Sequence, residues 1–270
     1  MVNFRFGFYL NGGLEMMQNQ WDALCKAITS IMAEHVQPFL SPISYSEGND
    51  YGKLHGTGSY ILFDDKEYLI TNEHVGNLDK KTTLQNQFFK DENIYVLRNQ
   101  FKSKPHPIDV AISYIDKELW STHTQYAQAI PSKRFALKHN PYKNELLFLA
   151  GYSGERSGFH YNNLISRCTP YLTQEMALPD NIQVADADFH FSLPYKPDLA
   201  TSVDGTSSLP DPHGFSGSLV WDTKRIACLA ENREWEPSMA EVTGILWGWP
   251  SSSSCLLATR VEKLSLKDLL

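Results

Sequence analysis

The sequence has few cysteines and no closely spaced pair of them. The four that occur, Cys25, Cys168, Cys228 and Cys255, are widely separated, and no Cys-x-x-Cys motif is present. This distribution does not indicate a disulfide framework, so we expect buried free thiols. Cys228 and Cys255 are the one pair for which the sequence leaves a disulfide open.

Basic charge is also scarce. The chain has 24 Lys and Arg residues against 31 Asp and Glu residues, a formal net charge of −7. Phosphate binding needs a basic face, so this balance argues against nucleic acid as a partner. No apolar run approaches the roughly 18 residues of a membrane span, and residues 1–10 lack the apolar core and cleavage site of a signal peptide. We therefore expect a cytoplasmic protein that binds no membrane.

Apolar residues are present in sufficient number for a sizeable core. The chain has 270 residues and 42% of them are apolar, and one large all-β unit often has this length. Between 54 and 115, short apolar runs alternate with polar turns, which predicts strands. We expect a loop over the polar stretch 79–93 and a connection between two halves over 120–140.

An amphipathic helix is predicted near the N-terminus. Apolar residues recur at spacings of three and four over 14–36, and Pro38 follows. We expect this helix to pack on the outside of the strands. The alternative is that it docks a regulatory partner or a second copy of the chain. Residues 1–13 fit either a strand or an ordered arm.

The central motif of the chain is Asp211-Pro212-His213-Gly214-Phe215-Ser216-Gly217-Ser218, followed by an apolar run over 219–221. A serine between two glycines before such a run predicts a tight turn that leads into a strand. Glycine at 214 allows successive backbone N–H groups to face one point, as an oxyanion hole requires. Taken alone, this pattern is more often a turn without a catalytic role.

Two upstream stretches supply what a reactive serine needs. His74 follows the apolar run 68–70, and Asp109 lies inside the apolar run 108–112. A serine hydroxyl is a poor nucleophile at neutral pH, so it needs a base, and the base needs a carboxylate that fixes its tautomer. A carboxylate in an apolar setting is costly unless its charge is used, which favours Asp109. The competing residues near the motifs are His55, His106, His213, Asp91 and Asp116.

Together these motifs resemble those of the chymotrypsin-fold (trypsin-like) serine peptidases, especially bacterial members without structural disulfides. The segments that carry the resemblance are 56–58, 71–75, 109–112, 214–218, 242–248 and 258–261. The resemblance implies an all-β fold of two antiparallel six-stranded β-barrels with an N-terminal helix and a short C-terminal helix. It also implies an arm and helix over 1–50 and a peptidase domain over 51–270, with the barrels at about 51–125 and 140–260.

The same resemblance implies roles for individual residues. His74 is the expected general base, Asp109 its orienting carboxylate and Ser216 the nucleophile. The N–H groups of Gly214 and Ser216 are the expected oxyanion hole. The residues implied to bind substrate are Asp211, His213, Leu246, Trp247, Gly248 and Trp249. No metal or cofactor is implied.

Four bulky or charged residues near the expected cleft bear on specificity and activation. Asp211 could attract a Lys or Arg side chain of a substrate, whereas Trp249 falls where relatives need a small residue and so favours a narrow pocket. Trp247 replaces a small polar residue that supports the aspartate in relatives, which leaves the support of Asp109 open. Phe215 replaces an aspartate that pairs with a newly cut N-terminus, so we expect activity without such cleavage.

The sequence thus predicts an intracellular serine endopeptidase that acts through an acyl-enzyme and cuts a dedicated protein partner. The alternative is a catalytically inactive relative that uses the two barrels as a peptide-binding module. An esterase of the α/β-hydrolase fold is disfavoured, because in that arrangement the serine precedes the histidine.

Overall fold

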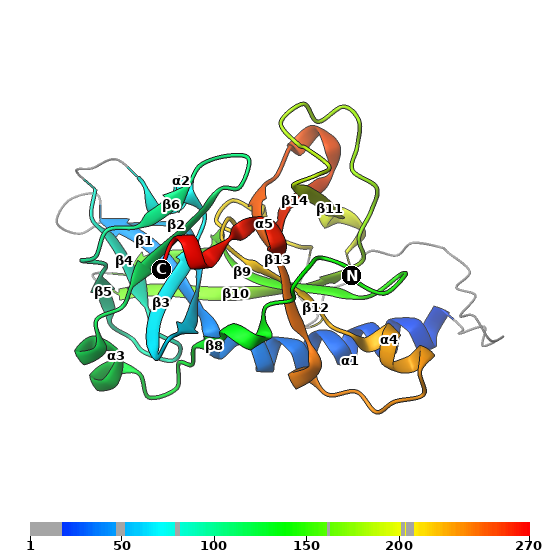
Figure 1. Ribbon diagram of the computed structural model, residues 1–270, viewed down its shortest axis with the longest axis horizontal. Helices are drawn as coiled ribbons and strands as arrows, with labels where there is room; N and C mark the ends of the chain where they lie inside the picture. The colour runs from blue at the N-terminus through cyan, green and yellow to red at the C-terminus, as the bar shows by residue number, and fades with distance from the viewer. Residues whose placement is uncertain (1–17, 47–51, 79–81, 161–162, 201–202, 204–207) are drawn as a thin grey trace.

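The computed structural model describes residues 18–46, 52–78, 82–160, 163–200, 203 and 208–270. Two sheets lie next to each other, and the long helix α1 (Gln18–Val36) runs along one side of them (Figure 1). Among these described residues, every strand pair is antiparallel except one short parallel pair.

The first sheet has eight strands among the described residues. They are β1 (Leu40–Ser46), β2 (Gly52–Phe63), β3 (Lys66–Thr71), β4 (Leu84–Gln87), β5 (Ile94–Val96), β6 (Lys102–Lys104), β7 (Val110–Tyr114) and β8 (Ile130–Pro131). Their order is β5-β4-β1-β2-β3-β7-β6, and β8 adds to β2 in parallel. Because β1 pairs with both β2 and β4, the segment before residue 51 supplies a strand of this sheet as well as a helix.

The second sheet has six strands in the described part of the chain. They are β9 (Leu147–His160), β10 (Asn163–Thr173), β11 (His190–Pro194), β12 (Leu219–Asp222), β13 (Glu241–Gly248) and β14 (Cys255–Arg260), in the order β10-β9-β12-β13-β14-β11. The remaining α-helices are α2 (Glu73–Gly76), α3 (Lys117–His123), α4 (Arg225–Ala230) and α5 (Val261–Leu264). The 3-10 helices are η1 (Gln37–Phe39), η2 (Ser132–Arg134), η3 (Pro197–Leu199), η4 (Pro237–Met239), η5 (Ser251–Ser253) and η6 (Leu266–Asp268).

The predicted fold class is confirmed in its main features: two antiparallel sheets, an N-terminal helix and a short C-terminal helix. The first sheet differs from the expected six strands, because two segments expected to be connections form β4 and β8. In β4 the buried residues Leu84 and Asn86 alternate with partly exposed neighbours. Asn86 Nδ2 donates a 2.6 Å hydrogen bond to Tyr60 Oη. This hydrogen bond offsets the cost of burying the amide of Asn86, and composition alone does not reveal that such a partner exists.

Helix α1 packs against the protein's own strands. Its buried face contains Cys25, Ile28, Thr29, Met32, Ala33 and Val36, and the helix contacts β9 and β10. Burying each large aliphatic side chain contributes about 1.5–3 kcal/mol, which is enough to fix the helix in place. The first of the two interpretations, a helix on the outside of the strands, therefore describes 18–36, while 14–17 and the predicted arm 1–13 lie outside the described residues.

The interior is continuous between the two sheets. One cluster of buried side chains includes Val110 and Ile112 from β7 together with Leu219 and Val242 from the second sheet. The expected connection over 120–140 also joins the halves, since Ala136 N–H donates to the carbonyl of Val242. The two sheets thus share one core, and residues on facing edges are held at fixed positions.

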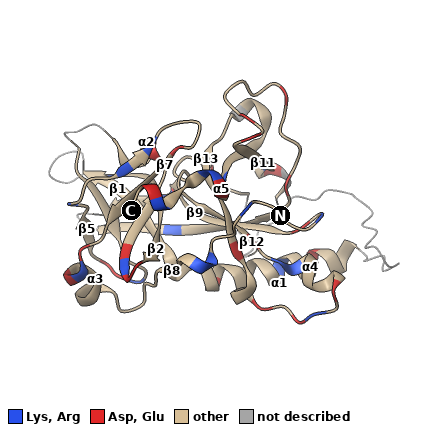
Figure 2. Ribbon diagram, viewed as in Figure 1, with Lys and Arg blue, Asp and Glu red and all other residues tan. Residues whose placement is uncertain are grey.

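Charged side chains of both signs are interspersed over the two halves (Figure 2). All four cysteines are free, including Cys228 and Cys255. Within the described residues, no helix is both long enough and apolar enough to cross a membrane.

Candidate active site

The imidazole of His74 lies against a carboxylate. β3 ends at Thr71 and α2 begins at Glu73, so His74 lies where the chain turns away from the sheet. Its Nδ1 is 2.7 Å from Oδ2 of Asp109. Because a carboxylate only accepts hydrogen bonds, Nδ1 carries a proton, and in the neutral ring Nε2 therefore has the lone pair. The side chain is 45% exposed, so a substrate can reach the ring.

Asp109 is buried and held in an unusual backbone conformation. It is 5% exposed, lies immediately before β7 and has a φ of +50°, a region that aspartate tolerates better than most residues. Its Oδ1 accepts from the His74 N–H at 3.2 Å, and its carbonyl accepts from Asn72 Nδ2 at 2.7 Å. The structure therefore brings together His74 and Asp109, and Asn72 supplies support that the sequence left open.

Ser216 lies in a loop between two glycines with left-handed backbones. φ is +103° at Gly214 and +91° at Gly217. A Cβ at 217 would lie 2.0 Å from the carbonyl oxygen of Thr57, so only glycine fits there. The loop leads directly into β12, and this is the tight turn before a strand that the sequence predicts.

Two backbone amides of this loop are available to a ligand. The carbonyl preceding Gly214 accepts from Gly154 N–H at 3.0 Å, and the carbonyl preceding Ser216 accepts from Ser218 N–H at 2.9 Å. The N–H and C=O of a trans peptide point in opposite directions, so the N–H groups of Gly214 and Ser216 face away from these contacts. Across the described residues, neither amide donates to another backbone group.

Thr57 on β2 connects the serine loop to the first sheet, and sequence reasoning did not single it out. Its N–H donates to the carbonyl of Ser216 and its Oγ1 donates to the carbonyl of Gly214, both at 2.8 Å. The same Oγ1 accepts from Tyr152 N–H at 2.9 Å, and the Thr57 carbonyl accepts from Thr71 Oγ1 at 2.8 Å. Its segment, 56–58, was among those that carry the family resemblance, but no role was predicted for the threonine itself.

Gly56 lies between the segment that follows His74 and the backbone of the serine loop. A Cβ on Gly56 would lie 2.6 Å from Val75 Cγ1 and 3.3 Å from the carbonyl oxygen of Ser216. The residue after His74 and the backbone of Ser216 therefore lie against the same glycine. In the described structure the ring of His74 is hydrogen-bonded to Asp109, and no hydrogen bond joins it to Ser216 Oγ. The nucleophilic role of Ser216 stays a prediction.

The competing histidines and acids have other surroundings. His55 packs edge-on against Tyr45, and its burial lowers its pKa, as does the charge of the nearby His74, while backbone hydrogen bonds oppose this shift. Asp91 accepts from a tyrosine hydroxyl, and Asp116 from an asparagine amide. Among the described residues, no three His, Cys, Asp or Glu side chains form a group that could hold a metal ion.

The carboxylate expected to attract a basic substrate side chain already has a partner. Asp211 Oδ1 accepts from the N–H of His213 at 2.9 Å and also contacts the Nδ1 of its ring. The ring of Trp249 lies edge-on to His213, with 5.5 Å between the centroids. Asp211, His213 and Trp249 thus form one cluster beside the serine loop.

The expected pocket wall on β13 is only partly accessible. Leu246 is 2% exposed, its carbonyl accepts from Gly217 N–H at 2.9 Å, and its N–H donates to Ser218 at 2.8 Å. The backbone of Leu246 therefore holds the serine loop through two hydrogen bonds. β12 pairs with β13 as far as Ile245 and the serine loop binds Leu246, and no described strand pairs with this edge of β13 beyond Leu246. The part of the wall that stays partly exposed is Trp247, Gly248 and Trp249.

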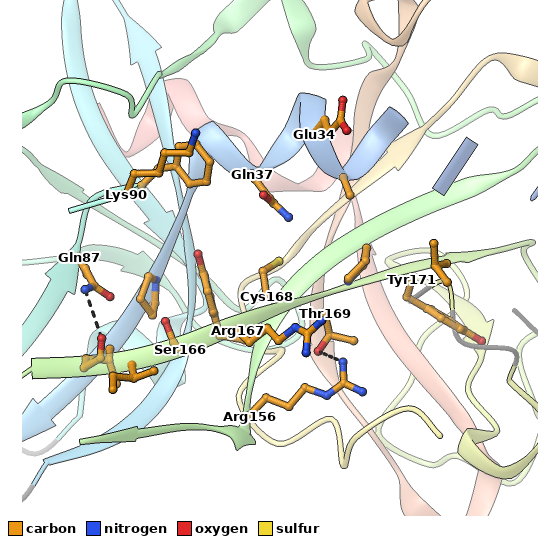
Figure 3. A pocket seen from close by; sticks show the side chains of 18 of the residues that line it. Glu34, Gln37, Gln87, Lys90, Arg156, Ser166, Arg167, Cys168, Thr169 and Tyr171 are labelled. Carbon is orange, nitrogen blue, oxygen red and sulfur yellow. Dashed lines mark hydrogen bonds between the residues drawn. The ribbon is translucent and has the colours of Figure 1, made fainter. Parts of the chain in front are cut away.

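A separate groove of about 850 Å³ lies between α1 and β10, with residues 87–92 and part of β9 completing its walls. Gln87 Nε2 donates to the Leu164 carbonyl at 3.3 Å. Figure 3 shows the side chains of Gln87 and Arg156 among those that line the groove. Burial raises the pKa of the Cys168 thiol in this groove to about 12, so the thiol stays protonated. None of the three predicted catalytic residues lines the groove.

No protein-family model matches the chain, and no curated protein matches it in sequence. Among solved structures, it is similar to the MamO protease domain from Magnetospirillum magneticum, with 11% identity, a TM-score of 0.48 and coverage of 87% of this chain and 97% of that one. It is also similar to the Rv3671c protease from M. tuberculosis, with 15% identity, a TM-score of 0.47 and coverage of 87% of this chain and 81% of that one. The serine protease domain of the Sesbania mosaic virus polyprotein is similar with 13% identity, a TM-score of 0.43 and coverage of 83% of this chain and 88% of that one. The chain thus resembles chymotrypsin-like serine proteases in fold.

Proposed function

We propose that this chain is a serine endopeptidase that uses Ser216, His74 and Asp109. The observation that carries the proposal is the 2.7 Å hydrogen bond between His74 Nδ1 and the buried carboxylate of Asp109. This bond leaves Nε2 as a base on an accessible ring. The reaction further requires a hydroxyl nucleophile and an oxyanion site. The glycine-flanked loop at Ser216 supports both.

In the proposed reaction Ser216 Oγ attacks the peptide carbonyl carbon while His74 Nε2 takes the hydroxyl proton. Asp109 stabilises the resulting imidazolium and keeps its orientation. The N–H groups of Gly214 and Ser216 stabilise the negative charge on the carbonyl oxygen, and loss of one such donor costs about 10²–10³ in turnover. The imidazolium then protonates the leaving amine, and water hydrolyses the acyl-enzyme by the same steps.

Labelling with a fluorophosphonate probe tests this proposal. We expect the wild-type chain to be labelled and Ser216→Ala and His74→Ala to lose the label. Ser218→Ala is the matched control, because Ser218 lies two residues away and is fully buried. Equal labelling of wild type and Ser216→Ala would overturn the assignment of the nucleophile.

The second candidate is a peptide-binding module without catalysis. Trp247 and Trp249 on the partly exposed strand edge favour it, because aromatic side chains and an open edge suit an extended peptide. A folded wild-type chain that takes up no probe but binds peptides supports this function and refutes the enzyme.

For the substrate, the proposal is a narrow or unusual pocket and a dedicated protein partner in a reducing, intracellular compartment. The contact between Asp211 and His213 and the position of Trp249 support the pocket, and the four free cysteines support the compartment. A peptide-library digest tests it. Cleavage confined to bonds after Lys or Arg would refute the pocket proposal.

A further inference from the structure

The loop that carries Asp109 is bound by the second sheet. This loop, residues 105–109, connects β6 and β7 of the first sheet. His190 Nε2 on β11 donates to the carbonyl of Pro107 at 2.7 Å, and Thr259 Oγ1 on β14 donates to the carbonyl of Ile108 at 2.9 Å. The two carbonyls immediately before Asp109 are therefore held from outside its own sheet.

The two donors are neighbours across a strand pair. β11 and β14 pair in a register that places His190 directly opposite Thr259. Residues directly opposite each other on paired strands lie about 5 Å apart, so both side chains can reach the turn over residues 106–108. Both donor residues are fully buried, so water does not compete for their N–H and O–H groups.

The protonation state of His190 is fixed by its other nitrogen. Nδ1 accepts from the N–H of Asp186 at 2.9 Å, so the single ring proton lies on Nε2 and points at the Pro107 carbonyl. The rings of Trp247 and His106 pack on His190 at centroid distances of 4.9 and 5.7 Å. The bulky Trp247 thereby braces the loop of Asp109 through His190.

The held conformation is one that the backbone does not favour. Asp109 has a φ of +50°, and such a residue persists only where its surroundings determine it. With Asn72 on its own carbonyl, three successive carbonyls from 107 to 109 each accept from a side chain. These three bonds set the direction of the carboxylate toward His74.

We infer that His190 and Thr259 are positioning residues for the proposed reaction, which hold Asp109 in hydrogen-bonding geometry with His74. This inference rests on the proposed function for its catalytic consequence, whereas its geometric part is independent of catalysis. The second sheet, which carries Ser216, also fixes the partner of the base.

The test compares Thr259→Val, which keeps the shape and removes the hydroxyl, with Thr259→Ser, which keeps the hydroxyl. Thr243→Val is the matched control, because Thr243 is equally buried in the second sheet and its hydroxyl is hydrogen-bonded to His139 Nδ1 at 2.8 Å. Three quantities are measured for each variant: the fluorophosphonate labelling rate, the thermal midpoint, and the NMR resonance of the His74 Nδ1 proton.

We expect Thr259→Val to slow labelling by about 10- to 100-fold, since sub-ångström to 1 Å misplacement has effects of this size. We also expect it to shift or broaden the His74 Nδ1 resonance, and Thr259→Ser to restore both. Thr243→Val should lower the thermal midpoint and leave the resonance and the labelling rate unchanged. An unchanged resonance and rate in Thr259→Val overturn the inference.

His190→Phe provides a second variant that keeps aromatic packing on Trp247 and removes the donor, and it serves if Thr259→Val does not fold. The resonance separates this inference from the proposed function. If the wild type takes up no probe, the enzyme proposal fails, and the shift of the His74 proton in the variants still decides whether the two residues position Asp109.

Discussion

The N–H of Thr57 donates a 2.8 Å hydrogen bond to the carbonyl of Ser216, and through it the first sheet holds the serine loop of the second. The hydroxyl of the same threonine binds Gly214 and Tyr152. A single side chain at the junction therefore satisfies polar groups of both halves, and its loss should affect stability and reactivity together.

Thr57→Val is expected to destabilise the protein by about 1–3 kcal/mol, because it leaves the buried Tyr152 N–H and the part-buried Gly214 carbonyl without their partner. Chemical denaturation measures this loss, and labelling should slow in parallel. Thr57→Ser keeps the hydroxyl and is expected to lose about 1 kcal/mol for one methyl group. Equal destabilisation by both variants would contradict the role given to the hydroxyl.

Gly217→Ala should disrupt the serine loop. The added Cβ would lie 2.0 Å from a backbone oxygen at a φ of +91°, and a backbone atom cannot move aside as a side chain can. We expect a loss of more than about 2 kcal/mol in unfolding free energy and at least about tenfold in labelling rate. The control is Gly158→Ala, where the added atom has nothing within 4 Å. A Gly217→Ala protein with wild-type stability would show that the loop lies elsewhere.

Phe215 bears on activation. Its side chain is fully buried and packs edge-on against Tyr195 at a centroid distance of 6.1 Å, so it can form no ion pair with a free N-terminus. We expect the chain Met1–Leu270 to be labelled at its full mass. Intact-mass spectrometry of the labelled protein checks this, and label found only on an N-terminally shortened form would show that cleavage activates it.

The main fold and the positions of the site residues could be predicted because their signals are local. His74, Asp109 and Ser216 each stand beside a strand-like run, and the glycines at 214 and 217 mark the loop. The contact between His190 and the Asp109 loop could not be predicted, because it depends on β11 pairing with β14 across 69 positions, from 190 to 259. Local patterns carry no information on such a register.

Leu246 gives the opposite case. The resemblance of 242–248 to a pocket strand marked it as a substrate contact, and alternation along a strand cannot tell which side of the loop it faces. In the structure both of its backbone groups bind the serine loop. Similarly, strand β4 was not predicted, because the polar run Gln85-Asn86-Gln87 is typical of a loop. In the structure Asn86 is buried and its amide is hydrogen-bonded to a tyrosine.

His213→Ala should release Asp211. In the wild type the carboxylate of Asp211 is engaged by His213, and an exposed pair of this kind contributes roughly 0.2–1 kcal/mol. We expect the variant to favour cleavage after Lys or Arg about two- to fivefold more than the wild type, as measured by a peptide-library digest. Adding Asp211→Asn should abolish the gain. An unchanged preference in His213→Ala would show that Asp211 does not face the substrate.

Stability should fall as the pH falls below about 6.5. Burial lowers the pKa of His190 below its ordinary value of 6.5, and the nearby charges of His106 and Arg260 lower it further. The hydrogen bond to Pro107 and the charge of Asp186 act in the opposite direction. The unfolded chain therefore takes up a proton first on acidification, and stability is lost between pH 6.5 and the lower folded pKa.

One such group changes the unfolding free energy by at most about 1.4 kcal/mol per pH unit. Urea denaturation at pH 8, 7, 6 and 5.5 measures the slope for wild type and for His190→Phe. The difference between the two slopes isolates this histidine from all other titrating groups. We expect the variant to have the flatter curve, and parallel curves would contradict the assignment.

The division of the proposed chemistry between two sheets has a consequence for the chain during its synthesis. The base and its carboxylate are made first, and the hydroxyl comes on a segment that must be translated, folded and docked before it meets them. On the proposed mechanism, a chain whose second sheet is unfinished lacks the nucleophile, so hydrolysis is expected only after that sheet has folded.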